Sequence, residues 1–466
     1  MPKRVATSQG ASIRSLLLPG WGQMATTHPI VGRLLVLVTG LAFIALLTAF
    51  LFLGPMEMLA WLANPDVLFY LVVANVLYLL MRFVSAGFAY REGARSRKWI
   101  LVPLVAVIVT IPHIAVAWVG WETRDAILTV FAAPEEPIPT TTTTSSTTTT
   151  TTTIIELSPI GTIPGQNDAE VENLKVTQGW RPFGEDRLNI LLLGGDAGPG
   201  RNGLRTDTMI VASIDPVSGD AALIGLPRNY GGITLTDGTP IPVTQLGHVY
   251  GWGRRNEVRF GGVDPGAEAV KDALTHITGL AIDHYVLVDL TGFAEVVDAF
   301  GGVSLDVPEP VDGPLYDVRT GGYQMVVIPA GRQHLDGAHA LAYSRARYGS
   351  SDYARMGRQR CVLASMAAQA DLLTLFGRLG TILDVAAANL TTDMPSEMIP
   401  DLIRLTPRVS ASTTRLIGFD GAWAKGFTST GRAIPDIDRI REAVRTTIED
   451  PDAAGSVGAA TAEAGC

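Results

Sequence analysis

The stretch YSRARYGSSDYARMGRQR holds five arginines, one aspartate and no lysine, in a 466-residue chain whose formal net charge is -9. A guanidinium group is a planar fork that can bind two phosphate oxygens at once. Arg345 and Arg347 are two residues apart, so they share a face if the backbone is extended there. Asp352, Arg355 and Gln359 are spaced i, i+3 and i+7, which places them on one face of a helix. A nucleic-acid patch, a solvated helix face and a phosphate clamp all fit this stretch alone.

Carboxylates and arginines also flank the apolar runs of the preceding segment. Asp196 ends LNILLLGGD, Arg205 and Asp207 precede the run MIVASI, and Arg228 is the second-last residue of LIGLPRN. The turn DPVSGD predicts a hairpin of the second and third strands, so the start of one and the end of the other lie at the same sheet edge. If the first strand runs parallel to the third, Asp196 joins them there, at the kind of edge where α/β sheets bind ligands. Solvated turn residues are the alternative.

Several arginine guanidinium groups next to two aspartate carboxylates suggest a bound pyrophosphate with a divalent metal. Mg²⁺, or Mn²⁺ in its place, prefers oxygen ligands, and the arginines would neutralise the phosphate oxygens. We therefore expect Arg345, Arg347 and Arg355 to form a buried clamp. A surface helix whose arginines pair with acidic residues remains the alternative.

The elements around these residues predict a layered α/β domain over residues 187–450, with a central mixed sheet. The segments LNILLLGGD, IDHYVLVDL and TTRLIGF have the pattern of strands. PGAEAVKDALTHITG and TGFAEVVDAFGG have helical apolar spacing and end in glycine. Helices are also expected over 336–343, 352–369 and 435–449.

Three apolar runs, at residues 30–54, 67–89 and 99–121, are each long enough to span a bilayer, which takes about 20 residues. Basic residues precede the first run and lie between the second and third, which predicts a cytoplasmic N-terminal segment (1–29) and an extracytoplasmic domain after three transmembrane helices (30–121). The threonine-rich residues 140–153 predict a linker over 122–186, and we expect a disordered tail over 451–466. The cytoplasmic segments are short and lack a helix-turn-helix pattern, so we expect no nucleic-acid partner.

The segments NILLLGGD, LRTDTMIVASID, LIGLPRN, GHVYGWG, IDHYVLVDLTGFAEVVDAFGGVSLDVP, AGRQHLDGAHALAYSRAR and DYARMGRQR occur in this order. In these segments, over residues 188–366, the chain resembles the LytR-CpsA-Psr family of cell-wall glycopolymer ligases. The last two segments are the most specific. The resemblance implies an enzyme that takes a glycopolymer from a polyprenyl-pyrophosphate carrier outside the cell membrane and attaches it to peptidoglycan through a phosphodiester.

The resemblance also implies roles for individual residues, since the family binds the pyrophosphate with arginines and a divalent metal. The implied pyrophosphate-binding residues are Arg205, Arg228, Arg345, Arg347, Arg355 and Gln359. The implied metal ligands are Asp196 and Asp207. The implied catalytic residues are Asp207, Arg228, Arg345 and Arg347. An apolar cavity in the same domain is implied for the lipid tail.

The chain departs from the family pattern at two places. GGDAG has Ala197 and Gly198 where a serine and an arginine are common, and PRN has Asn229 where PRD is usual. Arg201, in the same loop as GGDAG, is a candidate replacement for the missing cation. A polyprenyl-pyrophosphate phosphatase or hydrolase, and a non-catalytic module that binds lipid-linked glycan, are the alternative functions. Of the two cysteines, we expect Cys361 to pack as a small apolar side chain without a disulfide to Cys466.

Overall fold

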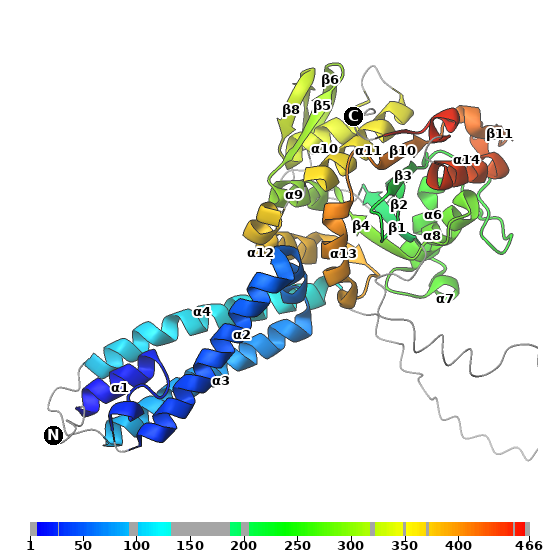
Figure 1. The fold of residues 1–466 in the computed structure, drawn as a ribbon. Coiled ribbons are helices and arrows are strands. Elements are labelled where there is room, and N and C mark those ends of the chain that lie inside the picture. The colour runs from blue at the N-terminus through cyan, green and yellow to red at the C-terminus, as the bar shows by residue number, and fades with distance from the viewer. Residues whose placement is uncertain are drawn as a thin grey trace, which may run out of the picture.

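The computed structural model describes residues 7–26, 28–92, 101–131, 187–196, 205–316, 322–347, 351–369, 372–450 and 453–461. Figure 1 shows a long helical bundle joined at one end to an α/β domain. The predicted linker, apart from its first residues to 131, lies outside the described residues.

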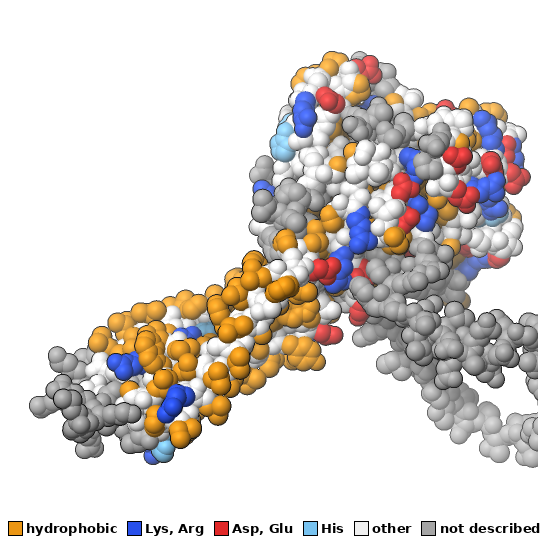
Figure 2. All heavy atoms as spheres, viewed as in Figure 1, with side chains coloured by type: hydrophobic (Ala, Val, Ile, Leu, Met, Phe, Trp, Pro, Cys, Tyr) orange, Lys and Arg blue, Asp and Glu red, His pale blue; other side chains and the backbone are white. Residues whose placement is uncertain are grey.

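Among the residues that the structure describes, three helices of the bundle are long and apolar enough to cross a membrane, as the sequence predicts. They are α2 (Pro29–Leu62), α3 (Pro65–Glu92) and α4 (Leu101–Val130), preceded by the short helix α1 (Ser8–Leu17). Hydrophobic side chains cover the bundle along its length in Figure 2. Two helices continue beyond the predicted spans: α2 passes residue 54 after a kink, and α4 passes residue 121. Their extra turns bury Leu59, Ala60 and Ile127.

In the described part of the domain, the strands form a seven-stranded mixed sheet in the order β13-β10-β3-β2-β1-β4-β9, so the predicted fold class is confirmed. Its strands are β1 (Leu188–Gly195), β2 (Thr206–Ile214), β3 (Ala221–Gly225), β4 (His284–Val288), β9 (Leu390–Thr392), β10 (Thr414–Gly418) and β13 (Ala460–Thr461). β2 pairs antiparallel with both β1 and β3. β1 and β3 therefore run in the same direction, which is the condition on which the predicted site depends.

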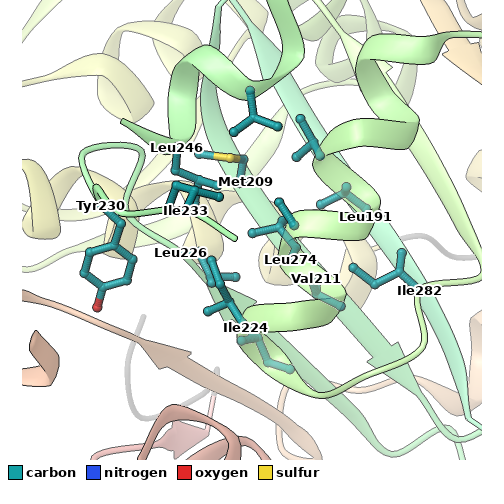
Figure 3. Packing of buried hydrophobic residues seen from close by; sticks show 14 of the residues in the cluster. Leu191, Met209, Val211, Ile224, Leu226, Tyr230, Ile233, Leu246, Leu274 and Ile282 are labelled. Atoms are coloured by element: carbon teal, nitrogen blue, oxygen red, sulfur yellow. The ribbon is translucent and has the colours of Figure 1, made fainter. Parts of the chain in front are cut away.

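Helices cover both faces of the sheet because neighbouring residues of each strand point to opposite sides. One face packs on α6 (Val249–Arg254), α8 (Pro265–Thr278) and α14 (Ile437–Glu449), through the core that Figure 3 shows around Leu191, Val211 and Ile224. The opposite face packs on α11 (Asp352–Gln369), through Ile210, Leu223 and other apolar side chains.

Further elements surround the α11 face of the sheet. The helices are α9 (Leu290–Phe300), α10 (Gly337–Arg345), α12 (Leu372–Asn389) and α13 (Ile399–Leu405). The strand pairs are β5 (Val303–Val307) with β8 (Gly331–Leu335), and β6 (Val311–Tyr316) with β7 (Tyr323–Ile328). A third pair, β11 (Ala424–Phe427) with β12 (Ala433–Pro435), and the short helix α7 (Glu257–Phe260) complete the domain.

Two expectations for the C-terminal part are wrong. Within the tail predicted to be disordered, Ala460 and Thr461 form β13, which adds an edge strand to β10 through backbone pairing with Leu416 and Arg415. Cys361 packs in the apolar layer between α11 and the sheet, as expected, but it is disulfide-bonded.

Candidate functional site

A cavity of about 820 Å³ lies on the α11 face of the sheet, at the carboxyl ends of β1 and β4. Its wall divides into two kinds of surface. The polar part is formed by Asp196, Asp207, Thr208, Arg228, Asp289, Ser344, Arg345, Arg347, Arg355 and Gln359. The apolar part is formed by Leu192, Leu193, Val286, Val288, Leu290, Phe293, Val296, Pro314, Tyr323, Met325, Leu341, Leu363, Met366 and Leu390. The cavity therefore suits an amphiphile with a charged group and an apolar chain.

The ends of the first three strands supply the first charged group. Arg228, just after β3, forms an ion pair with Asp207 of β2. Asp196 follows β1, and its Oδ1 accepts a hydrogen bond of 2.8 Å from the backbone N–H of Arg205. The structure thus brings Asp196, Asp207 and Arg228 to the same end of the sheet, as the strand directions predict.

Asp352, the first residue of α11, joins this group to the arginines of the motif. Its carboxylate lies 3.1 Å from Nη2 of Arg355, 3.4 Å from Nη2 of Arg347 and 3.9 Å from Nε of Arg228. Three guanidinium groups from two separate segments therefore share one carboxylate. The i, i+3 spacing of Asp352 and Arg355 signals their contact, but the contact with Arg228 is a tertiary one that local spacing does not reveal.

Arg355 is the most buried of the predicted clamp residues, with 4% of its side chain exposed. Its Nη2 also donates to the backbone oxygen of Asp207 at 3.3 Å. Burial lowers the pKa of Arg355 to about 10, against the opposing effect of Asp352, so it stays charged at neutral pH. Its buried Nε, and Oγ of Ser344, have no hydrogen-bond partner among the described residues. Buried donors of this kind need a partner, and both residues line the cavity.

The remaining predicted clamp residues differ in position. Gln359 is buried, and its Nε2 donates to the backbone oxygen of Ser344 at 3.3 Å. Arg345 is partly buried, with its guanidinium carbon 5.7 Å from the centroid of the Tyr316 ring. The side chain of Arg347 is 45% exposed, so the expectation of a fully buried clamp is wrong for Arg347.

The backbone around Arg345 and Arg347 also differs from the expected path. α10 continues to Arg345, and the extended backbone begins at Ala346, with φ -56° and ψ 133°. Arg358 holds this exit, because its guanidinium donates to the backbone oxygens of Tyr343, at 3.1 Å, and of Ala346. Arg358 is therefore a positioning residue for the segment that carries Arg345 and Arg347.

Arg360, the last arginine of the motif, packs against the sheet and is not in the cavity wall. A Cβ added to Gly225 or Gly418 would lie 2.5 Å or 2.4 Å from its Nη1. These glycines are paired on neighbouring strands β3 and β10, and their lack of a side chain makes room for the guanidinium. Burial lowers the pKa of Arg360 to about 10.

Other predicted residues lie at the edge of the site or outside it. Arg205 is exposed and is not among the residues that line the cavity. Asn229, at the PRN departure, is also outside the cavity wall. The GGDAG departure at Ala197 and Gly198, together with Arg201, lies outside the described residues.

The carboxylate oxygens at the polar end fit a small cation that prefers oxygen ligands. Asp196 and Asp207 line the cavity at the ends of adjacent strands, next to the arginines. Among the described residues there is no group of three or more potential metal ligands. Mg²⁺ keeps several waters and needs only one or two carboxylates besides a phosphate, so two aspartates are sufficient.

Residues 162–440 match the model of the LytR_cpsA_psr family. The polyisoprenyl-teichoic acid–peptidoglycan teichoic acid transferase TagU of Oceanobacillus iheyensis is 31% identical over 221 residues, which are 47% of this chain and 62% of that protein. The cell wall biosynthesis protein LcpA of Corynebacterium glutamicum is 28% identical over 207 residues, which are 40% of this chain and 38% of that protein. The crystal structure of TagV from B. subtilis matches 57% of this chain and 98% of that one, with 23% identity and a TM-score of 0.44.

Proposed function

The chain belongs to the LytR_cpsA_psr family, and on that premise we propose that it transfers a glycopolymer from a polyprenyl-pyrophosphate carrier to peptidoglycan. The matched segment covers 62% of the TagU relative, so the activity, substrates and partners of the whole chain are part of the proposal. The observation that supports it best is a single cavity with clustered arginines and aspartates next to an apolar wall. A pyrophosphate joined to a prenyl chain has the same division of polarity.

The proposed reaction is a phosphoryl transfer. A peptidoglycan hydroxyl attacks the phosphorus next to the glycan, and the bond between this phosphorus and the bridging oxygen breaks. Polyprenyl phosphate leaves, the glycan is joined to peptidoglycan by a phosphodiester, and the hydroxyl proton passes to water or to a carboxylate. Negative charge therefore builds on the leaving phosphate, which positioned cations stabilise.

The arginines of the site are suited to that task in different ways. Arg355 is held by Asp352 and by a backbone oxygen, so its guanidinium is already positioned before substrate binds. Preorganised donors in a site that excludes water stabilise developing charge most effectively. Arg347, whose side chain is 45% exposed, and the partly buried Arg345 would contact the outer phosphate oxygens and the glycan side of the carrier.

A divalent cation is part of the proposal as a cofactor. Asp196 and Asp207 would hold Mg²⁺ or Mn²⁺, which would neutralise pyrophosphate oxygens when bound. Arg228 keeps the Asp207 carboxylate in place through their ion pair. We further propose that the N-terminus is cytoplasmic and that the α/β domain is extracytoplasmic, because basic residues lie before the first span and between the second and third.

The test uses the full chain in proteoliposomes that contain a polyprenyl-pyrophosphate oligosaccharide. Added peptidoglycan should acquire the oligosaccharide in a metal-dependent manner. Release of free glycan phosphate at the same rate with and without peptidoglycan would instead identify a hydrolase. Saturable binding without either product would identify a binding module.

A further inference from the structure

The α/β domain is joined to the bundle by a packed interface, which we call the joint. Its apolar core contains Ala63 and Leu68 from the α2–α3 end, Ala126 and Ile127 from α4, Leu383 from α12 and Ile399 from α13. Ile127 is fully buried there. Figure 1 shows α12 and α13 next to the end of the bundle, and in Figure 2 charged side chains gather in the same region.

An ion pair also connects the two sides of the joint. Nε of Arg404, on α13, lies 2.8 Å from Oε2 of Glu57, on α2, and Nη1 lies 2.9 Å from Oδ1 of Asp401. Glu57 is close to a kink at Gly54, where φ is 74° and ψ is 162°, followed by Pro55. A positive φ favours glycine, and proline interrupts the helical hydrogen bonds. The kink re-aims the last turns of α2, which then pack on α13.

The joint is also in contact with the wall of the cavity. Phe131, at the end of α4, packs in one apolar cluster with Leu192 and Val286, which line the cavity. α12 packs on α4 and also on α9, where Nδ2 of Asn389 donates to Glu295 at 2.7 Å. The opposite side of α9 lines the cavity. Helix α12 therefore lies between α9, which lines the cavity, and α4 of the bundle.

Strand β1 gives the direction of the cavity relative to the joint. Leu188, at its start, is in the cluster with Phe131, Leu192 lines the apolar wall, and Asp196 follows at the polar end. At about 3.3 Å per strand residue, the eight steps from Leu188 to Asp196 span roughly 26 Å. The part of the apolar wall around Leu192 thus lies between the end of the bundle and the charged residues.

We propose that the joint is a loading device. It holds the apolar side of the cavity close to the membrane, so that a polyprenyl chain passes from the outer leaflet directly into the cavity. This inference rests on the proposed function. It predicts that the joint is needed to load a lipid embedded in the bilayer and is not needed to bind a short, water-soluble analogue.

The experiment measures photocrosslinking of two probes to the full chain in proteoliposomes. One probe is a photoreactive long-chain polyprenyl pyrophosphate within the vesicles, and the other is a photoreactive short-chain prenyl pyrophosphate in solution. Glu57→Arg places like charges together at the joint, and Ile127→Asp puts a carboxylate in its core. The matched control is Glu122→Arg, on an exposed position of α4.

We expect Glu57→Arg and Ile127→Asp to reduce crosslinking of the long-chain probe by about tenfold or more, because a chain that must pass through water exposes methylene groups, and exposure of two of them already costs about tenfold. Crosslinking of the short probe should stay within about twofold of wild type and of the Glu122→Arg control, because the joint is distant from the charged residues. The double reversal of Glu57→Arg with Arg404→Glu should restore loading. Equal losses for both probes, or no loss with either joint variant, would overturn the proposal.

Glycan transfer to peptidoglycan is measured in the same vesicles. A chain that loads the lipid in a joint-dependent way but transfers nothing would contradict the proposed function and leave the loading role supported. Glycan transfer at the wild-type rate in the joint variants would support the proposed function and contradict the loading role.

Discussion

Asp352→Asn is the substitution that tests the arrangement of the arginines most sharply. The carboxylate of Asp352 lies within 4 Å of Arg355, Arg347 and Arg228. Asparagine keeps the shape and can accept one of these hydrogen bonds, but it removes the charge. Arg355, with 4% of its side chain exposed, then loses the partner that offsets its burial.

The size of the effect follows from burial. Loss of one partner of a fully buried ion pair costs about 3–5 kcal/mol, and loss of an exposed pair costs about 0–1 kcal/mol. The side chain of Asp352 is 22% exposed, so an intermediate cost of about 2 kcal/mol is expected. For a domain of this size that corresponds to a melting temperature lowered by roughly 4–8 °C. Movement of the arginines by about 1 Å should also lower kcat/KM by about 10².

Thermal unfolding by calorimetry and the initial rate of glycan transfer measure the two effects. Asp438→Asn is the matched control, because Asp438 also lies in the first turn of a helix, on an exposed position of α14. The helix N-terminus affects both aspartates similarly. If Asp352→Asn has the same melting temperature and the same transfer rate as Asp438→Asn, the Asp352 carboxylate does not organise the arginines and the reasoning fails.

Four further outcomes are expected. Arg355→Lys should reduce the transfer rate nearly as much as Arg355→Ala, by about 10²–10³, because lysine lacks the forked guanidinium group. Arg205 lies outside the cavity wall, so Arg205→Ala should reduce the rate less than about tenfold. Equal losses at both positions would contradict the placement of Arg355 inside the cavity and of Arg205 outside it. Asp207→Asn should leave the domain folded by circular dichroism and abolish Mg²⁺-dependent turnover; full metal-dependent activity would refute its role. Burial, with Arg205 nearby, lowers the pKa of His248 below 6.5. The free energy of unfolding should therefore fall as the pH drops from 6.5 through the folded-state pKa. His248→Gln should lessen that fall in a series of melting temperatures measured at different pH. A reporter fused after Thr153 should be active only in its extracytoplasmic form, and cytoplasmic activity would contradict the proposed topology.

Local patterns predicted the parts of the site that depend on one helix or on one hairpin. The spacing of Asp352, Arg355 and Gln359 placed them on one helix face because helical geometry is fixed by the residue interval. The hairpin of β2 and β3 placed Asp207 and Arg228 together because two antiparallel strands share an edge. These inferences needed no knowledge of packing.

Other parts depend on contacts between distant segments. The exposure of Arg347 and of Arg205 is set by neighbouring loops and strands, which periodicity does not describe. The pair of strands β6 and β7 brings Pro314, Tyr323 and Met325 into the cavity wall, and their sequence alone gives no sign of that position. The packing of α13 on α2 joins segments that are 347 residues apart at the Arg404–Glu57 pair, and no local signal marks it.

The central claim is that the glycan moves together with its adjacent phosphate from the lipid carrier to peptidoglycan. The most direct measurement uses the reconstituted full chain, Mg²⁺, peptidoglycan and a polyprenyl-pyrophosphate oligosaccharide with ³²P only in the phosphate next to the glycan. The account predicts that the label appears in peptidoglycan, resistant to phosphomonoesterase, with one unlabelled polyprenyl phosphate released for each glycan transferred. Label that stays with the prenyl product, or that leaves as free glycan phosphate while peptidoglycan remains unlabelled, would contradict it.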